Sequence, residues 1–78
     1  MQLIARFTGR NDNLDEEFDN AEVTSIFING NKLYMYDDDG NTVARAELYL
    51  DHNRPLWRLK RGQRGHEIGD YPQISLSV

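Results

Sequence analysis

The sequence contains no cysteine, two prolines and no long apolar run. Without cysteine the chain can form neither a disulfide nor a thiolate metal site. Because small secreted domains usually depend on disulfides, this absence favours an intracellular, cytoplasmic location. The apolar run at residues 3–5 is too short for a signal peptide, and no stretch approaches the ~20 apolar residues of a membrane-spanning helix. We therefore expect no contact with a membrane.

Residues that typically carry catalysis are also scarce. The chain has two histidines and no glycine-rich phosphate loop of the strand-to-helix type. His52 follows Asp51 and His66 precedes Glu67, both in segments rich in turn-forming residues. No spacing indicates a nucleophile next to a base, or a bound metal. We expect no enzymatic activity, no catalytic residues, no metal and no cofactor.

Length and charge set further bounds. The 78 residues, including three Phe, four Tyr and one Trp, are enough for a single domain spanning residues 1–78. Residues 1–51 carry eleven acids and four bases, whereas residues 52–78 carry five bases and two acids. The net charge of −4 argues against a surface that binds nucleic acid as a whole, but the basic C-terminal third allows local contact.

Turn signals between alternating apolar and polar residues predict antiparallel hairpins. Asn29-Gly30 and Asp39-Gly40 have the composition of type I′ turns, in which both central residues have positive φ. Residues 52–55 form a third connection. Each connection sets the register of one hairpin. The predicted pairs include Ile26 with Leu33 in the first hairpin, Leu33 with Ala46 in the second, and Leu48 with Leu59 in the third.

These registers divide the central strands into two faces. The first is apolar and should pack in the core, and it comprises Ile26, Ile28, Leu33, Met35, Ala44, Ala46, Leu48, Leu50, Trp57 and Leu59. The second is mixed and comprises Val23, Ser25, Phe27, Lys32, Tyr34, Tyr36, Val43, Arg45, Glu47, Tyr49, Arg58 and Lys60. Lys60 should lie opposite Glu47, which supports the third register.

The flanking segments complete the predicted fold. Residues 2–8 should form a first strand, residues 61–73 a loop, and residues 74–78 a last strand. We expect an all-β fold, a small antiparallel meander of five or six strands curled into a barrel or sandwich, with at most one short helical turn. The alternative is an α+β fold with a short helix at about 13–19, begun by a capping box.

The mixed face is the main candidate binding site. It brings together three tyrosines and four bases: Lys32, Tyr34, Tyr36, Arg45, Tyr49, Arg58 and Lys60. Tyrosine and arginine are enriched in interface hot spots. We therefore predict a non-enzymatic module that binds a protein partner. The alternative is a binder of single-stranded nucleic acid, in which bases stack on the tyrosines and on Trp57 while Arg58, Lys60, Arg61 and Arg64 hold phosphates.

An acidic loop is the second candidate region, and it comprises Asp12, Asp15, Glu16, Glu17 and Asp19. Ordered carboxylates can imitate a phosphate backbone. Small size and acidic charge then suggest the setting of a phage or mobile-element accessory or inhibitor protein. Counted from Asn11, oxygen-bearing residues also match the EF-hand positions, but Glu16 stands where that loop requires glycine. Calcium binding is therefore the weaker interpretation.

Overall fold

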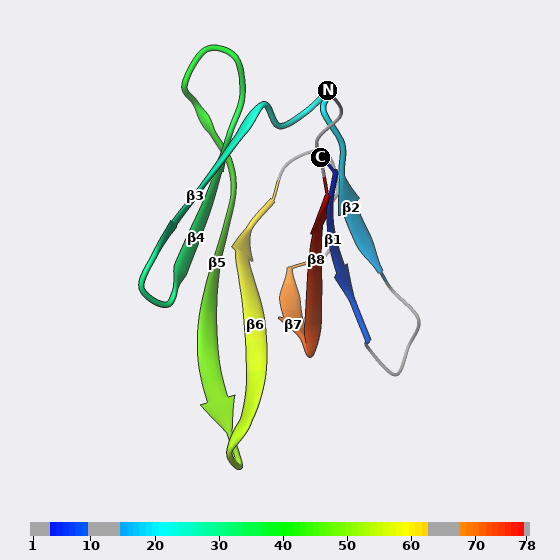
Figure 1. The fold of residues 1–78 in the computed structure, drawn as a ribbon, viewed down its shortest axis with the longest axis vertical. Helices are drawn as coiled ribbons and strands as arrows, with labels where there is room; N and C mark the ends of the chain where they lie inside the picture. Colours follow the sequence, from blue (N-terminus) through cyan, green and yellow to red (C-terminus); the bar gives the residue numbers. More distant parts are fainter. Residues whose placement is uncertain (1–3, 10–14, 63–67, 78) are drawn as a thin grey trace.

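Eight antiparallel strands and no helix make up the part of the chain that the computed structural model describes, residues 4–9, 15–62 and 68–77. The strands are β1 (Ile4–Thr8), β2 (Glu16–Phe18), β3 (Ser25–Asn29), β4 (Lys32–Tyr36), β5 (Thr42–Asp51), β6 (Arg54–Arg61), β7 (Gly69–Tyr71) and β8 (Gln73–Ser77). They form a sheet of three strands, in the order β2-β1-β8, and a sheet of five, in the order β3-β4-β5-β6-β7 (Figure 1). Among these residues there is no helix that could cross a membrane.

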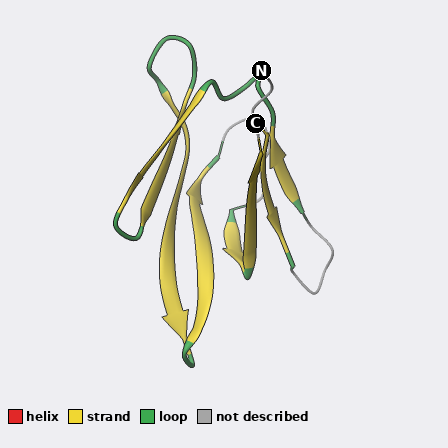
Figure 2. Ribbon diagram, viewed as in Figure 1, coloured by secondary structure: helices red, strands yellow, loops and turns green. Residues whose placement is uncertain are grey.

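The two sheets share one hydrophobic core. The ring of Phe7 on β1 meets Phe18 on β2 edge-on at 5.9 Å, and meets Tyr71 on β7 at 5.5 Å. All three side chains are buried, so the smaller sheet packs against the larger one through aromatic contacts. The predicted all-β fold is confirmed, and the sheets pack as two layers that do not close into a barrel (Figure 2).

Two short strands explain why the structure has more strands than the five or six predicted. Residues 16–18, part of the helix considered at about 13–19, form β2 instead and pair with β1. The alternative α+β fold is therefore wrong for this segment, because pairing with β1 satisfies the backbone hydrogen bonds and still buries Phe18. Residues 69–71, predicted as part of a loop, form β7 and bury Tyr71.

The first and third hairpins are each displaced by two residues from the predicted register. In the first, Gly30 and Asn31 form the turn, with φ of 62° at Gly30, so Ile26 pairs with Met35 rather than Leu33. The glycine at the first central position with positive φ is typical of a type II′ turn. A displacement of two residues keeps every side chain on its predicted face, because the side-chain period of a strand is two.

The third hairpin turns on two residues rather than on the four at 52–55. His52 and Asn53 have φ of 49° and 63°, the left-handed pair of a type I′ turn. Leu48 consequently pairs with Trp57 instead of Leu59, and Leu59 pairs with Ala46. Here too the error is two residues, and the faces of Trp57 and Leu59 are as predicted.

The second hairpin has the predicted register with a different turn. Leu33 pairs with Ala46 and Tyr34 with Arg45, as predicted. The turn is longer than two residues. The Asp37 carbonyl accepts from the Gly40 N–H at 3.1 Å, and the Asp37 N–H donates to the Asn41 carbonyl at 3.0 Å. Gly40 has φ of 81°, which fits a type I turn followed by a left-handed residue.

Four apolar side chains differ in burial from the prediction. Val43 is buried because a bulge between Met35 and Tyr36 shifts the register, and Val23 is buried where the chain enters β3. Ile28 and Leu50, predicted in the core, are 53% and 75% exposed. Both lie near the ends of hairpins, and the long β5–β6 hairpin extends beyond the smaller sheet (Figure 2).

Candidate interaction face

The side of the larger sheet that points away from the core carries all seven residues of the predicted binding face. We call this side the outer face. On β4 the alternation is direct, since Lys32, Tyr34 and Tyr36 alternate with the buried Leu33 and Met35. Contacts among the side chains divide the outer face into two halves of different character.

The first half is closed by ion pairs, and we call it the ion-pair half: Glu47, Tyr49, Arg58, Lys60 and Asp70. At its centre one carboxylate oxygen of Glu47 accepts from Lys60 Nζ at 2.5 Å and from the Tyr49 hydroxyl at 2.6 Å. These two bonds, with the Lys60 bond the larger, lower the pKa of Glu47 to about 2. Glu47 is therefore ionised at neutral pH and already bonded to its neighbours.

Arg58 completes this half. Its guanidinium lies 4.5 Å from the centre of the Tyr49 ring and donates to the two Asp70 oxygens at 2.8 and 3.4 Å. The hydrogen bonds to Asp70 raise the pKa of Arg58. Lys60 Nζ also lies 5.5 Å from the Tyr49 ring centre. The ring of Tyr49 is thus in contact with two cations, each of which has an acidic partner.

Asp70 was not among the predicted site residues. It belongs to β7, a segment predicted as a loop because of its glycines. In the β6–β7 pairing it lies opposite Arg58. A bulge explains how Lys60 reaches Glu47. The register shifts between Arg45 and Ala46, which pair with Arg61 and Leu59 respectively, so Lys60 is the extra residue of β6.

The second half is open, and we call it the tyrosine half: Phe27, Lys32, Tyr34, Tyr36 and Arg45. The rings of Tyr34 and Tyr36 stack with centres 6.4 Å apart and planes 13° apart. Phe27, opposite Tyr34 in the β3–β4 pairing, is 55% exposed. Lys32 and Arg45 are exposed, and neither makes an ion pair with any residue that the structure describes.

Arg45 has an unusual neighbour for an exposed strand position. It lies between Tyr34 on β4 and Arg61 on β6, so a second cation faces it across the strands. Like charges directly opposite one another destabilise a sheet. The pair therefore does not stabilise the sheet, and solvent screens the repulsion because both side chains are exposed.

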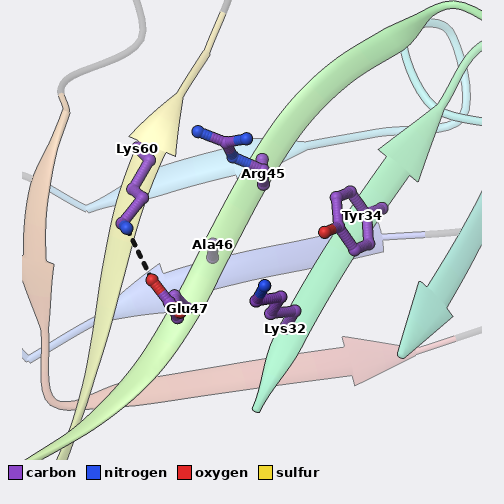
Figure 3. Close-up of a pocket in the computed structure, with 6 residues that line it drawn as sticks. All are labelled: Lys32, Tyr34, Arg45, Ala46, Glu47 and Lys60. Atoms are coloured by element: carbon purple, nitrogen blue, oxygen red, sulfur yellow. Dashed lines mark ion pairs between the residues drawn. The ribbon is translucent and has the colours of Figure 1, made fainter. Parts of the chain in front are cut away.

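A hollow of about 140 Å³ lies where the two halves meet (Figure 3). Its lining comes from β4, β5 and β6 and consists of Lys32, Tyr34, Arg45, Ala46, Glu47 and Lys60. Three cations and one carboxylate line it, and that carboxylate is bonded to Lys60. The hollow is thus electropositive, and it suits an anionic or hydrogen-bond-accepting group.

The acidic segment lies elsewhere. Asp12 is outside the described residues, while Glu16 and Glu17 belong to β2 of the smaller sheet. Glu17 pairs with Arg6 on β1 at 3.3 Å, and the Asp19 side chain accepts from the Ala21 N–H at 3.0 Å. These acids therefore support their own strand and turn, and the structure does not bring them to the outer face.

The described residues contain no cluster of acids and histidines that could hold a metal ion. Asn11 and Asn13 of the EF-hand match lie outside them, as does His66. His52 is 94% exposed at the tip of the β5–β6 hairpin, 3.7 Å from the carboxylate of Asp51.

No family model, curated protein or solved structure matches this chain. A function must therefore be argued from the outer face alone.

Proposed function

We propose that this protein is a non-enzymatic interaction module that binds a protein partner through the tyrosine half of its outer face. One observation carries the proposal: two exposed cations that form no ion pair with the described residues, Lys32 and Arg45, flank a hollow beside a stacked tyrosine pair. The phage or mobile-element setting remains a prediction, based on size and charge alone.

The tyrosine half has the composition and order of a protein interface. Tyr34 and Tyr36 are partly buried and stack on each other, so little side-chain entropy remains to be lost when a partner covers them. Tyrosine and arginine at the centre of an interface account for much of its affinity. Lys32 and Arg45 would meet acidic or carbonyl groups of the partner, which also relieves the repulsion between Arg45 and Arg61.

The alternative, single-stranded nucleic acid, gains less support from the outer face. Trp57, a predicted stacking residue, packs against the core. The ring of Tyr49 is in contact with Arg58 and Lys60, and those two cations are bonded to Asp70 and Glu47. The acids of the ion-pair half neutralise its cations, which leaves less positive charge for phosphates. Fewer aromatic rings and cations are therefore available than the sequence suggests.

The proposal is tested by capture from a native lysate with tagged variants, with and without nuclease. Tyr34→Ala and Arg45→Glu should each weaken capture of the same partner by roughly thirtyfold, the effect of losing about 2 kcal/mol at a hot spot. The matched controls are Leu50→Ala and Arg54→Glu, because both residues are exposed on the β5–β6 hairpin, away from the hollow. The controls should capture as the unaltered chain does.

Three outcomes would contradict the proposal. Capture that disappears with nuclease and falls steeply with salt would indicate nucleic acid. Equal loss from the control variants would show that the tyrosine half has no special role. Loss on Glu16→Lys with Glu17→Lys, but not on Tyr34→Ala, would assign binding to the acidic segment and favour the phosphate-mimic interpretation.

A further inference from the structure

Strand β3 forms an outer edge of the larger sheet and pairs with β4 alone. Natural edge strands usually carry lysine, proline or a bulge that discourages pairing with another chain. Residues 23–31 have no charged residue and no proline, in a chain of which 28% is charged. Phe27 and Ile28, which point to opposite sides of the sheet, are 55% and 53% exposed. This edge therefore lacks the usual protection.

Two of the other sheet edges are short and charged. β7, the opposite edge of the larger sheet, has three residues, and one of them is the charged Asp70. β2 also has three residues, and two of them are Glu16 and Glu17. β8 is as long as β3 and uncharged, but Leu76 is its one large apolar side chain that is strongly exposed, at 42%, against two on β3. Among the edges of the described structure, β3 is thus the long, uncharged one with the most exposed apolar side chains.

The backbone pattern of β3 shows which groups face outward. Asn29 and Lys32 flank the two-residue turn, so they form a hydrogen-bonded pair, and pairs alternate from there along the hairpin. Phe27 is therefore bonded to Tyr34 within the sheet. The N–H and C=O groups of Ile26 and Ile28 then point away from β4, toward the open edge.

We propose that β3 binds the β3 strand of a second copy of this chain, antiparallel, about a two-fold axis at Phe27. In that register Ile26 of one copy faces Ile28 of the other, and the outward groups of these residues form four hydrogen bonds. The two Phe27 residues meet at the axis as a pair that is not hydrogen-bonded, the spacing at which side chains are closest.

The side chains support a second copy as the occupant. The two-fold register matches Ser25 with Asn29, Ile26 with Ile28 and Phe27 with itself, so like chemistry meets at every position. No charge of one copy faces the same charge of the other along the strand, although each chain has a net charge of −4. The two-fold axis also sets both tyrosine halves on the same side of a joined ten-stranded sheet.

The interface would be small. A single strand pair buries less than the ~1,200 Å² of a stable complex, so association should be weak, with a dissociation constant between about 1 µM and 1 mM. The proposal does not depend on the proposed function, because it needs neither a third protein nor the hollow.

Sedimentation equilibrium of the full chain over this concentration range tests the proposal. The unaltered chain should form dimers and no larger species, and Phe27→Lys or Ile28→Lys should weaken dimerisation at least tenfold, because each puts like charges close to the axis. Leu50→Lys is the matched control, since Leu50 is 75% exposed at another hairpin. It should leave the dimer intact. Thermal melts of all variants establish that they are folded.

Amide hydrogen exchange gives an independent measurement. The Ile26 and Ile28 N–H groups should become protected as concentration rises, whereas the Phe27 N–H, already bonded to β4, should change little. A chain that stays monomeric up to ~1 mM, or a dimer that Leu50→Lys disrupts and Ile28→Lys does not, would overturn the proposal. So would a monomer whose β3 amides become protected only on capture of a different protein.

Discussion

The two halves of the outer face use the same residue types in different ways. In the ion-pair half, Arg58 and Lys60 each bond to a carboxylate, and Tyr49 donates to one of them. In the tyrosine half, Lys32 and Arg45 have no such bond within the described structure, and Tyr34 and Tyr36 contact each other. The difference lies in which cations bond to the two acids: Lys60 and Arg58 form ion pairs with Glu47 and Asp70. Lys32 lies opposite Glu47 in the β4–β5 pairing without forming an ion pair with it.

Residue type alone therefore does not identify a binding surface. An arginine beside an acid across the strands contributes to the sheet, whereas Arg45 lies between a tyrosine and a second arginine, Arg61. The second arrangement leaves its charge available to a partner. The prediction from sequence treated all seven residues as one surface, and the structure separates those that bond within the sheet from those that do not.

Truncation of the buried leucines beneath the two halves should lower the free energy of unfolding most, and it tests whether the core is equally well packed under both. Leu33 lies under the tyrosine half and Leu59 under the ion-pair half, and both are fully buried. Truncation of either to Ala should lower the free energy of unfolding by ~2–5 kcal/mol, as the loss of a buried leucine typically does. Urea unfolding measures it.

Leu50→Ala is the control for this pair, because Leu50 is 75% exposed, and it should change the free energy of unfolding by less than about 0.5 kcal/mol. A much smaller loss for one of the buried leucines would show that its half rests on a loosely packed core. The comparison of the halves would then concern packing as well as surface chemistry.

The next prediction concerns the loop between β4 and β5. The β4–β5 loop of the tyrosine half depends on Gly40 at φ of 81°, and a Cβ atom there would meet no other atom within 4 Å. Gly40→Val should therefore cost roughly 1–2 kcal/mol through backbone strain alone. Gly40→Asn should cost less, since asparagine tolerates this conformation. Melting temperatures of the two variants should differ accordingly, and equal values would contradict the turn geometry.

The faces could be predicted from the sequence because alternation fixes them independently of the exact register. The first and third registers were wrong by two residues, an error that moved no side chain to the other side of the sheet. The turns could not be predicted exactly, since Asn29-Gly30 and Gly30-Asn31 are both acceptable hairpin turns. His52-Asn53 forms a type I′ turn without the glycine that usually signals one.

Contacts made by bulges and by short strands could not be predicted. Val43 changes side through a bulge that no local composition indicates, and Lys60 is the extra residue of another. Asp70 reaches Arg58 only because residues 69–71 pair with β6, and three residues are too few for a period-two signal. Which cations form ion pairs with the described residues was therefore unpredictable from the sequence.

The smallest effect tests the centre of the ion-pair half by pH. The Lys60 and Tyr49 hydrogen bonds lower the Glu47 pKa from 4.5 to about 2, so its ionised form is favoured in the folded state. A carboxyl group with a lowered folded-state pKa stabilises the protein above its unfolded pKa, and this contribution is lost as pH falls through the folded pKa.

Glu47→Gln should therefore melt at a lower temperature than the unaltered chain at pH 7, and this gap in melting temperature should close between about pH 4.5 and 2. Glu17→Gln is the control, because both side chains of the Glu17–Arg6 pair on the other sheet are about half exposed and the pair is screened by solvent. The melting temperature of this variant should hardly change. A gap for Glu47→Gln that persists unchanged at pH 2 would show that the substitution acts through packing, and that the ion-pair half is not held by the Glu47 charge.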